Sequence, residues 1–329
     1  MLVLAGDIGG TKTNLGLFIR GKSRPLPEVI EAYPSRDAKN LSEIIKKFIQ
    51  RHPARIQNAC FGIAGPVLNG RSKITNLPWE VSQDQLRQHF KWPRVRLIND
   101  LEATAIALPF LNNRELYVLN KTRIHRGRNI ALVAPGTGLG KVLLIYNNGR
   151  YWPVASEGGH ADFAPNSVEE VRLWKYLQGK FGHVSIERVL SGQGLANIYS
   201  WLQESTKLSE PKWLSDKMKT MDPAQAIGEA ALEKKNKLCM KTVNMFVSIL
   251  AAVAGNLALT AMTTGGVYLG GGISPKILPK INRKDFMASF TDKGRFKHFL
   301  EKIPVKVILN DKAALLGAAR CALEMDGHS

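Results

Sequence analysis

The segment of residues 97–104 constrains the fold more than any other part of the chain. A strand-like run, Val95–Ile98, passes directly into Asn99 and Asp100, and the helix-forming stretch Glu102–Leu108 follows. This order predicts an amide and a carboxylate at the C-terminal end of a buried strand, the edge where α/β sheets collect ligands. A carboxylate there is well placed to accept a proton from a substrate hydroxyl. The alternative is that Asp100 only caps the following helix, and the segment alone leaves both interpretations open.

The N-terminal part of the chain predicts three strands joined by tight turns, then a helix and a further strand. Alternation and turn residues place the strands at Leu2–Asp7, Asn14–Ile19 and Val29–Tyr33. Apolar residues at helical spacing indicate a helix over Leu41–Ile49, and the next strand is Ala59–Ile63. Three successive strands before the first helix are typical of a mixed sheet, so we expect an α/β fold with mixed sheets.

A second unit of strand, glycine turn and strand follows residue 110. Its parts are Ile130–Ala134, Gly136–Gly140 and Val142–Tyr146. Two such units, one near each end of the first half of the chain, suit a protein that clamps a polyanion between two lobes. The rest of the chain is predicted to be mainly helical. The elements expected there are helices at Val168–Leu177, about Ala224–Thr260 and Lys312–Leu323, and strands at Gly265–Gly272 and Val305–Leu309.

Length and composition favour an ordinary globular protein of about two domains, because the chain has 329 residues and is 44% hydrophobic and 22% charged. Cys60, Cys239 and Cys321 lie far apart in the sequence, a spacing that suits neither a zinc site nor a disulfide framework. This cysteine usage favours a reducing cytoplasm.

No segment of the sequence predicts a membrane span or a targeting signal. Met1–Ala5 is apolar but short, and it lacks a basic region. The stretch Thr242–Pro275 has no charged residue, but polar residues and Gly265-Gly266 interrupt it. Since a span needs about 20 predominantly apolar residues, we expect a buried helix followed by a buried strand.

The chain is strongly basic, with 46 Lys and Arg against 27 Asp and Glu, a net charge of +19. The basic residues are scattered without a long run and without interleaved aromatic residues. Examples are Arg123, Arg126 and Arg128; Lys234, Lys235 and Lys237; Lys293, Arg295 and Lys297. This pattern predicts a generally cationic surface that attracts anionic substrates weakly, and no nucleic-acid partner.

Two glycine turns suit phosphate oxygens, because glycines let backbone N–H groups approach them. The first runs from Gly6 through Asp7, Ile8, Gly9 and Gly10 to Thr11, where Thr11 can donate a hydroxyl and Asp7 can hold Mg²⁺ through water. The second is Pro135–Gly140 and contains Gly136, Thr137 and Gly138. Neither is a Walker or dinucleotide motif. Ordinary turns, the first a hairpin with glycines at positive φ, are the alternative for each taken alone.

A glycine-rich loop, Ser156–Phe163, concentrates polar side chains, and its Glu157 and His160 can hydrogen-bond a polyol. A metal site would need more ligands at defined spacing, so we do not predict one there. Glu187 is a further candidate, although an acid at the start of a helix is also favoured by the helix dipole.

Two further segments have both a functional and a structural interpretation. Thr75, Asn76 and Trp79 can supply polar and stacking groups to a sugar, or can form a simple turn. Gly270, Gly271 and Gly272 leave a strand where a flat base can lie against bare backbone, or they form an ordinary strand-to-helix turn.

Taken together, these motifs resemble those of the bacterial glucokinases of the actin-like, ribonuclease-H-like ATPase superfamily. The similarity covers nearly the whole chain, with all motifs in the family order. They are Gly6–Thr11, Thr75-Asn76, Leu97–Asp100, Gly136–Gly140, Glu157–His160, Glu187–Gly194 and Gly270–Gly272. The combination of Asn-Asp, Glu-Gly-Gly-His-x-Asp-Phe-Ala-Pro and Glu-Arg-Val-Leu-Ser-Gly is specific, whereas a single glycine turn is not.

The resemblance implies a two-lobed fold with glucose and ATP in an interlobe cleft, and Asp100 as general base for the glucose 6-hydroxyl. Asn99, Asp100, Glu157, His160 and Glu187, with Thr75 and Asn76, then match glucose contacts. Gly6–Thr11, Gly136–Gly138 and Gly270–Gly272 match the ATP side, with Mg²⁺ near Asp7. The implied domains are a small α/β domain, residues 1–110 plus about 302–329, and a large α+β domain, residues 111–301.

The sequence departs from the family pattern at two places. Lys12-Thr13-Asn14 follows the first turn, where relatives often carry Asn-Ala-Arg, and Pro135 precedes the second turn, where a small residue is more usual. A zinc-binding cysteine cluster and an N-terminal helix-turn-helix, which mark the related repressors, are missing. Another hexose or phosphate donor, or a sugar-binding regulator without turnover, are the alternatives to a glucokinase. The resemblance and the apolar helix ending at Thr260 favour a homodimer through the large domain.

Overall fold

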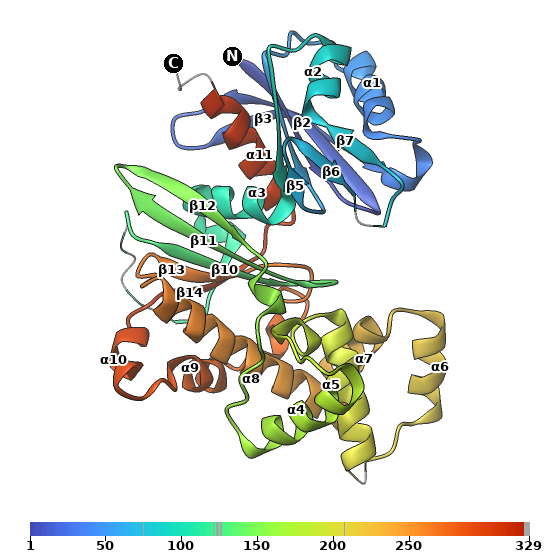
Figure 1. The fold of residues 1–329 in the computed structure, drawn as a ribbon, viewed down its shortest axis with the longest axis vertical. Coiled ribbons are helices and arrows are strands. Elements are labelled where there is room, and N and C mark those ends of the chain that lie inside the picture. Colours follow the sequence, from blue (N-terminus) through green and yellow to red (C-terminus); the bar gives the residue numbers. More distant parts are fainter. Residues whose placement is uncertain (75, 121, 123–124, 126, 207, 326–329) are drawn as a thin grey trace. The chain divides into compact units, whose positions relative to one another are not determined.

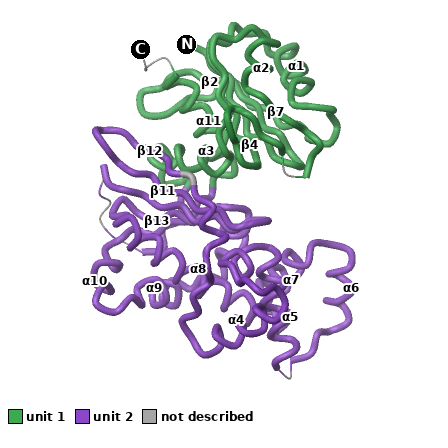
Figure 2. Tube along the Cα trace, viewed as in Figure 1, with its two compact units in different colours: residues 1–115, 310–329 green, residues 116–309 purple. Residues whose placement is uncertain are grey.

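The computed structural model describes residues 1–74, 76–120, 122, 125, 127–206 and 208–325. The chain forms two compact units, shown in Figure 2. Unit 1 contains Met1–Glu115 and the C-terminal segment from Asn310, and unit 2 contains Leu116–Leu309. The domain boundaries predicted from the sequence, near 110 and about 302, lie several residues before the two observed boundaries.

Unit 1 is built on a five-stranded mixed sheet of order β3-β2-β1-β4-β8 (Figure 1). Strand β1 pairs antiparallel with β2 and parallel with β4, and β4 pairs parallel with β8. The predicted order of three strands, a helix and a strand is therefore confirmed. The strands are β1 (Leu2–Ile8), β2 (Lys12–Arg20), β3 (Pro25–Pro34), β4 (Asn58–Ile63) and β8 (Arg94–Asn99), and a small second sheet contains β5 (Val67–Leu68), β6 (Arg71–Lys73) and β7 (Glu80–Ser82).

Alternating side chains of β1 supply both cores of unit 1, because successive residues of a strand point to opposite faces. Leu4 packs in a core with α1 (Leu41–Arg51) and α2 (Gln83–Phe90). Val3 and Ala5 pack in the other core with α3 (Asp100–Ala107) and α11 (Ala313–Glu324). Helices thus cover both faces of the sheet. The second core also contains Cys60 and Cys321, which, like Cys239, are free and buried.

Unit 2 combines a six-stranded mixed sheet of order β12-β11-β10-β13-β14-β9 with a set of helices. The strands are β9 (Leu116–Val118), β10 (Ile130–Pro135), β11 (Leu139–Asn147), β12 (Arg150–Ser156), β13 (Gly266–Leu269) and β14 (Val305–Ile308). The helices are α4 (Val168–Phe181), α5 (Gly192–Ser205), α6 (Lys212–Thr220), α7 (Pro223–Leu232), α8 (Lys237–Thr260), α9 (Arg283–Thr291) and α10 (Lys297–Leu300). The α/β class with mixed sheets is confirmed in both units.

The last strand of the chain belongs to unit 2, and its assignment to the small domain is wrong. Strand β14 pairs parallel with β13 and antiparallel with β9, with Lys306 opposite Val118. Its four residues are buried in the sheet of unit 2. The sequence predicted a strand at Val305–Leu309 correctly, but it carried no information on which sheet that strand joins.

The helix predicted from about Ala224 to Thr260 is two helices, α7 and α8. Lys234 interrupts them with φ of 57°, and Lys235 N–H donates to the carbonyl of Ala230 at 3.0 Å, a pattern that ends α7. Asn236 then caps α8 by accepting from the N–H of Cys239 at 2.9 Å. The polar run from Glu233 to Lys237 was the sequence signal for this break.

By length and composition alone, helix α8 can cross a membrane, but 72% of its most apolar window is buried inside the structure. It packs against α5, α7 and α9 in the core of unit 2. Met245 and Leu259, which lie on this helix, are partly buried against that same core. The unit itself therefore accounts for the apolar faces of this helix.

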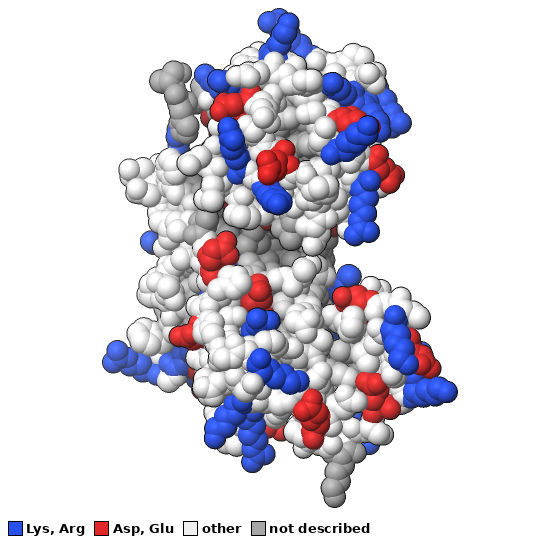
Figure 3. All heavy atoms as spheres, turned by 45° about the vertical axis from the view of Figure 1, so that its right-hand side comes forward, with Lys and Arg blue, Asp and Glu red and all other residues white. Residues whose placement is uncertain are grey.

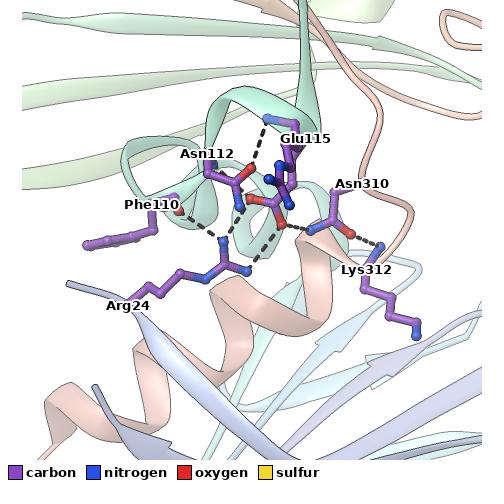
Figure 4. Close-up of polar contacts among 7 residues, drawn as sticks. Arg24, Phe110, Asn112, Glu115, Asn310 and Lys312 are labelled. Carbon is purple, nitrogen blue, oxygen red and sulfur yellow. Dashed lines mark hydrogen bonds and ion pairs between the residues drawn. The ribbon is translucent and has the colours of Figure 1, made fainter. Parts of the chain in front are cut away.

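The chain leaves unit 1 just after Glu115 and returns to it at Asn310. The carboxylate of Glu115 bonds to Asn310 and so links the two positions (Figure 4). Glu115 Oε2 accepts from Arg24 Nη1 at 2.7 Å and from the N–H of Asn112 at 2.8 Å. Its Oε1 accepts from Asn310 Nδ2 at 2.7 Å. Burial raises the pKa of Glu115, but these hydrogen bonds outweigh it and the pKa is lowered. The end of the unit is therefore held by charge-assisted hydrogen bonds.

Basic residues on the face drawn in Figure 3 are interspersed with acidic ones and form no continuous stripe there. Elsewhere in the salt-bridge network of the protein, Lys217 pairs with Glu229 at 2.6 Å and Lys47 with Glu43 at 3.2 Å. Arg123 and Arg126 lie outside the described residues. On the face drawn, the charges are mixed, as expected for scattered basic residues.

Candidate active site

Asp100 is the first residue of α3, directly at the C-terminal end of β8, as predicted. The helix is capped by Asn99, whose Oδ1 accepts from the N–H of Leu101 at 2.9 Å and from that of Glu102 at 3.4 Å. Asn99 Nδ2 donates to the carbonyl of Gly65 at 3.0 Å and keeps its second hydrogen. Asn99 therefore supplies the cap, and Asp100 is not needed for it.

Burial raises the pKa of Asp100 to about 6, and the neighbouring Asp7 carboxylate adds to this effect. The N–H of Leu101 donates to Asp100 Oδ1 at 2.8 Å and opposes the shift only in part. A carboxyl group of this kind changes its protonation near neutral pH, which suits a general base.

Asp7 lies near the end of β1, two strands away from Asp100 in the same sheet. Burial raises its pKa, while a hydrogen bond from Asn14 Nδ2 to Asp7 Oδ2, at 3.2 Å, lowers it. The Oδ1 atom of Asn14 is buried without a hydrogen-bond partner. The strand ends thus collect two carboxylates and an unused amide oxygen at one edge of the sheet.

The first glycine turn closes the hairpin of β1 and β2. Gly9 N–H donates to the carbonyl of Lys12 at 3.0 Å, and Thr11 is exposed. Gly9 and Gly10 do not have positive φ, so the interpretation as a hairpin with left-handed glycines is wrong. Ile8 is buried in the core, and Gly6 lies inside β1, where an added methyl group would lie 2.5 Å from the Phe61 ring. Gly6 therefore serves packing in the sheet.

Ser35, which the sequence analysis missed, supports this turn from the end of β3. Its Oγ donates to the carbonyl of Gly9 at 2.7 Å and lies 2.9 Å from Thr13 Oγ1. Its N–H donates to the carbonyl of Thr11 at 2.9 Å. A serine 22 residues from Thr13 gives no local sequence signal, since only the pairing of β2 with β3 brings the two together.

The segment after β6 contributes less than predicted. Thr75 lies outside the described residues. Asn76 is exposed, with φ of 66°, a conformation that asparagine tolerates better than most residues. Trp79 is buried in the core of unit 1, so its predicted role in stacking on a sugar is wrong.

In unit 2 the second glycine turn and the Gly270–Gly272 run lie together at the C-terminal ends of β10 and β13. Gly270 N–H donates to the carbonyl of Val133 at 2.8 Å. Gly271 has φ of 73°, and an added methyl group would lie 2.3 Å from the carbonyl oxygen of Pro135, so this position requires glycine. A methyl group added at Gly272 would meet no atom within 4 Å, and one added at Gly136 would have its nearest neighbour at 4.0 Å, so both positions have open space beside them.

The two polar loops of unit 2 are joined by a short ladder of backbone hydrogen bonds. Phe163 N–H donates to the carbonyl of Val184, and Ile186 N–H donates to that of Ala161, each at 2.9 Å. This ladder brings together the 3-10 helix Gly158–His160, which carries exposed Glu157 and His160, and the 3-10 helix Ile186–Arg188, which carries Glu187. The structure therefore unites three residues that the sequence separates by up to 30 positions.

Two contacts fix these loops to the start of β11. Lys141, which the sequence analysis missed, donates from Nζ to the carbonyl of Gly158 at 3.0 Å. Glu187 Oε2 accepts from the N–H of Leu139 at 2.8 Å, so Glu187 does more than begin a helix. Unit 1 thus supplies half-buried carboxylates, and unit 2 supplies exposed hydrogen-bonding side chains together with the glycine turns.

Comparisons with known proteins agree with this arrangement. A family profile of glucokinases matches residues 4–325. A curated glucokinase from Trichormus variabilis is 40% identical over 340 residues, which cover 98% of this chain and 99% of that protein.

Two solved structures extend the similarity to the fold. A glucokinase from an Antarctic psychrotroph superposes with a TM-score of 0.89 at 29% identity, over 98% of this chain and 99% of that one. A ROK family glucokinase from Streptomyces griseus, in complex with glucose and AMPPNP, has a TM-score of 0.63 at 21% identity, over 98% and 100%. The predicted two-lobed actin-like fold is confirmed. The chain belongs to the glucokinase family.

Proposed function

We propose that the protein transfers the γ-phosphoryl group of ATP to the 6-hydroxyl of D-glucose, with Asp100 as general base. The observation that carries this proposal is the place of Asp100 at the C-terminal end of β8, where burial and the neighbouring Asp7 raise its pKa to about 6. Such a carboxylate is ionised at neutral pH and basic enough to accept the hydroxyl proton as the oxygen attacks phosphorus. The capping role of Asn99 leaves Asp100 available for this task.

Glu157, His160 and Glu187 bind the sugar in this proposal, together with Asn99, Asn76 and Thr75. The support is the ladder that holds the first three side chains together and the exposure of Glu157 and His160. Carboxylates and imidazoles at hydrogen-bond distance discriminate strongly between a sugar and an analogue without the matching hydroxyl.

The glycine turns bind ATP in this proposal, with Gly9–Thr11 and Gly136–Gly138 at the phosphates and Gly270–Gly272 at the adenosine. The open space beside Gly136 and Gly272 supports close approach of a nucleotide to this edge of the sheet. The AMPPNP in the Streptomyces griseus structure makes ATP the natural donor to test.

Asp7 fits Mg²⁺ held through water. Its carboxylate is a hard oxygen donor, and the partnerless Oδ1 of Asn14 beside it can accept a hydrogen from a bound water. Among the described residues, no three acidic, histidine or cysteine side chains are grouped so that they could hold a metal ion together. Mg²⁺ with ATP would neutralise charge on the β- and γ-oxygens.

A coupled assay tests this function directly. ATP should be consumed with glucose at a much higher kcat/KM than with mannose, fructose or glucosamine, and polyphosphate should not replace ATP. Preference for another hexose or donor would show that the protein is a kinase with that substrate or donor instead. Glucose binding without turnover under every condition would favour a sugar-binding regulator.

We further propose a cytoplasmic homodimer that associates through unit 2. Free cysteines and a phosphorylated product support the location. The dimer is supported by the resemblance and by the frequency of two-fold association among soluble oligomers. Helix α8 adds no support, because most of its apolar surface is buried within its own unit. Light scattering should give about twice the mass of the 36.4 kDa chain.

A further inference from the structure

The carboxylate of Glu187 contacts the second glycine turn. Glu187 is also one of the residues proposed above to bind the sugar. Its Oε2 accepts from the N–H of Leu139, the first residue after the turn, at 2.8 Å. A methyl group added at Gly138 would lie 2.6 Å from the same oxygen. The turn is therefore packed directly against this side chain, and Gly138 gives the carboxylate the room it needs.

The backbone that follows Glu187 holds the other end of the same turn. Gly136 N–H donates to the carbonyl of Gly138, and Gly192 N–H donates to that of Gly136, each at 2.8 Å. Ser191 Oγ donates back to the carbonyl of Glu187 at 2.8 Å and makes residues 187–192 one braced segment. The turn is thus held from both sides by the segment that carries Glu187.

The loop of Glu157 and His160 lies against the same point of β11. An added methyl group at Gly159 would lie 2.2 Å from the carbonyl oxygen of Leu139, so the backbones pack closely. Lys141 Nζ holds the carbonyl of Gly158. Leu139 is therefore the residue where the turn, the Glu157 loop and Glu187 meet.

We propose that Glu187 is a positioning residue that links sugar occupancy to the conformation of the nucleotide turn. Oε2 holds Leu139, whereas Oε1 has no hydrogen-bond partner among the described residues and is available to a sugar hydroxyl. A sugar that fixes the carboxylate also fixes the turn, so the turn is ordered before the nucleotide binds. Because such coupling is reciprocal, each substrate tightens the other. This inference rests on the proposed function, which assigns Glu187 to glucose.

Calorimetry with AMPPNP tests the link without turnover. The coupling ratio is the Kd for AMPPNP without sugar divided by that at saturating glucose, with saturation established separately for each variant. For the unmodified protein we expect a ratio of at least about 5, the lower end of common allosteric couplings. Glu187→Ala removes the contact with Leu139 and should bring the ratio to within about twofold of 1.

Three further variants separate the link from simple sugar binding and from misfolding. Glu187→Gln keeps an oxygen that accepts from Leu139, so it should weaken glucose binding but retain most of the ratio. Glu187→Asp keeps the charge but is too short to reach Leu139, so its coupling ratio should also fall close to 1. This variant tests the link even if the alanine variant does not fold. Glu157→Gln is the matched control, because Glu157 has no hydrogen bond to the turn. It should raise the Kd for glucose and leave the ratio unchanged.

The inference is overturned by a ratio near 1 in the unmodified protein, by an unchanged ratio in Glu187→Ala or Glu187→Asp, or by an equal loss in Glu157→Gln. Failure of the proposed function has a different signature, because the unmodified protein would then bind or phosphorylate another hexose instead of glucose. The same ratio measured with that hexose would still test the link through Glu187.

Discussion

The two units prepare their parts of the candidate site in different ways. In unit 1 the two carboxylates lie at the C-terminal ends of strands β1 and β8, and burial raises the pKa of both Asp7 and Asp100. In unit 2 the side chains of Glu157 and His160 are exposed on a 3-10 helix and its flank. Their positions depend on backbone contacts between loops rather than on a strand.

This difference separates reactivity from recognition. Desolvation changes the basicity of a carboxylate, so a reactive group benefits from the buried end of a strand. A group that only hydrogen-bonds a hydroxyl needs correct placement and access to the ligand. We therefore expect substitutions in unit 1 to affect mainly kcat and those in the loops of unit 2 to affect mainly KM for the sugar.

The largest effect is expected for Asp100→Asn. The amide keeps the size of the side chain and an oxygen for the N–H of Leu101, but it cannot accept the substrate proton. General bases contribute about 10²–10⁴-fold, so kcat should fall by this amount while glucose still binds. Steady-state kinetics and calorimetry with glucose measure the two quantities.

Glu102→Gln is the matched control for this substitution. Glu102 is also partly buried on α3, burial also raises its pKa, and it faces Arg96 at 3.8 Å. It should retain kcat within about threefold, as expected for a carboxylate outside the chemistry. A folded Asp100→Asn variant with near-normal kcat would show that Asp100 is not the general base. The contrast between a reactive group in unit 1 and recognition groups in unit 2 would then fail.

The next largest effect is expected in unit 2, for Glu157→Ala and His160→Ala. Loss of one hydrogen bond to a charged group costs about 1.5–3 kcal/mol, equivalent to about 10–100-fold in KM for glucose. KM for ATP should change much less. Both side chains are exposed, so the thermal stability of the variants should stay close to that of the unmodified protein. An equal rise in both KM values would show that the loop is not the sugar site.

Much of unit 1 could be predicted from the sequence because its signals are local. The run from Val95 to Asp100 predicts a strand and a carboxylate at its end, and both are found there. The helix cap, considered for Asp100, is supplied by Asn99 instead. Ser35 and Asn14 could not be found in this way. Their partners, Gly9 and Asp7, become neighbours only through strand pairing.

Unit 2 was harder to predict, since its site is held by contacts between distant segments. The motifs around Glu157 and Glu187 were visible, but not the ladder between them or the contact of Glu187 with Leu139. Strand β14 shows the same limit, because hydrophobicity predicts that a strand is buried and not which neighbours it pairs with.

A smaller effect, on stability, tests the raised pKa of Asp100 without any substrate. The folded protein has this pKa near 6, against an ordinary value of 3.8, so folding favours the protonated form. Below about pH 4 the group is protonated in both states and there is no penalty; as pH rises towards 6, ionisation increasingly destabilises the fold. Asp100→Asn escapes this penalty and should be more stable well above pH 6 by about 3 kcal/mol, from 1.36 kcal/mol for each pKa unit between 3.8 and about 6.

Urea unfolding of both proteins between pH 4 and pH 8 measures this difference. It should grow from pH 4 to about pH 6 and then remain constant. A difference that does not depend on pH would mean that burial does not shift the pKa of this carboxyl group. Unit 1 would then not differ from unit 2 in holding a carboxyl group of raised basicity.

The smallest effect concerns how unit 1 supports its glycine turn. Unit 2 holds its turn with a carboxylate and backbone groups, whereas unit 1 uses the hydroxyl of Ser35, which binds the carbonyl of Gly9 and contacts Thr13. Ser35→Ala leaves buried Thr13 and half-buried Gly9 without that contact, at a cost of about 1 kcal/mol in the free energy of unfolding. KM for ATP should rise about two- to fivefold, as a turn that must be ordered on binding loses affinity, while KM for glucose should not change. Ser23→Ala, at an exposed serine in the β2–β3 turn, is the control and should change neither quantity. A rise in KM for glucose as large as that for ATP would mean that the hairpin turn of unit 1 supports the sugar side rather than the nucleotide side.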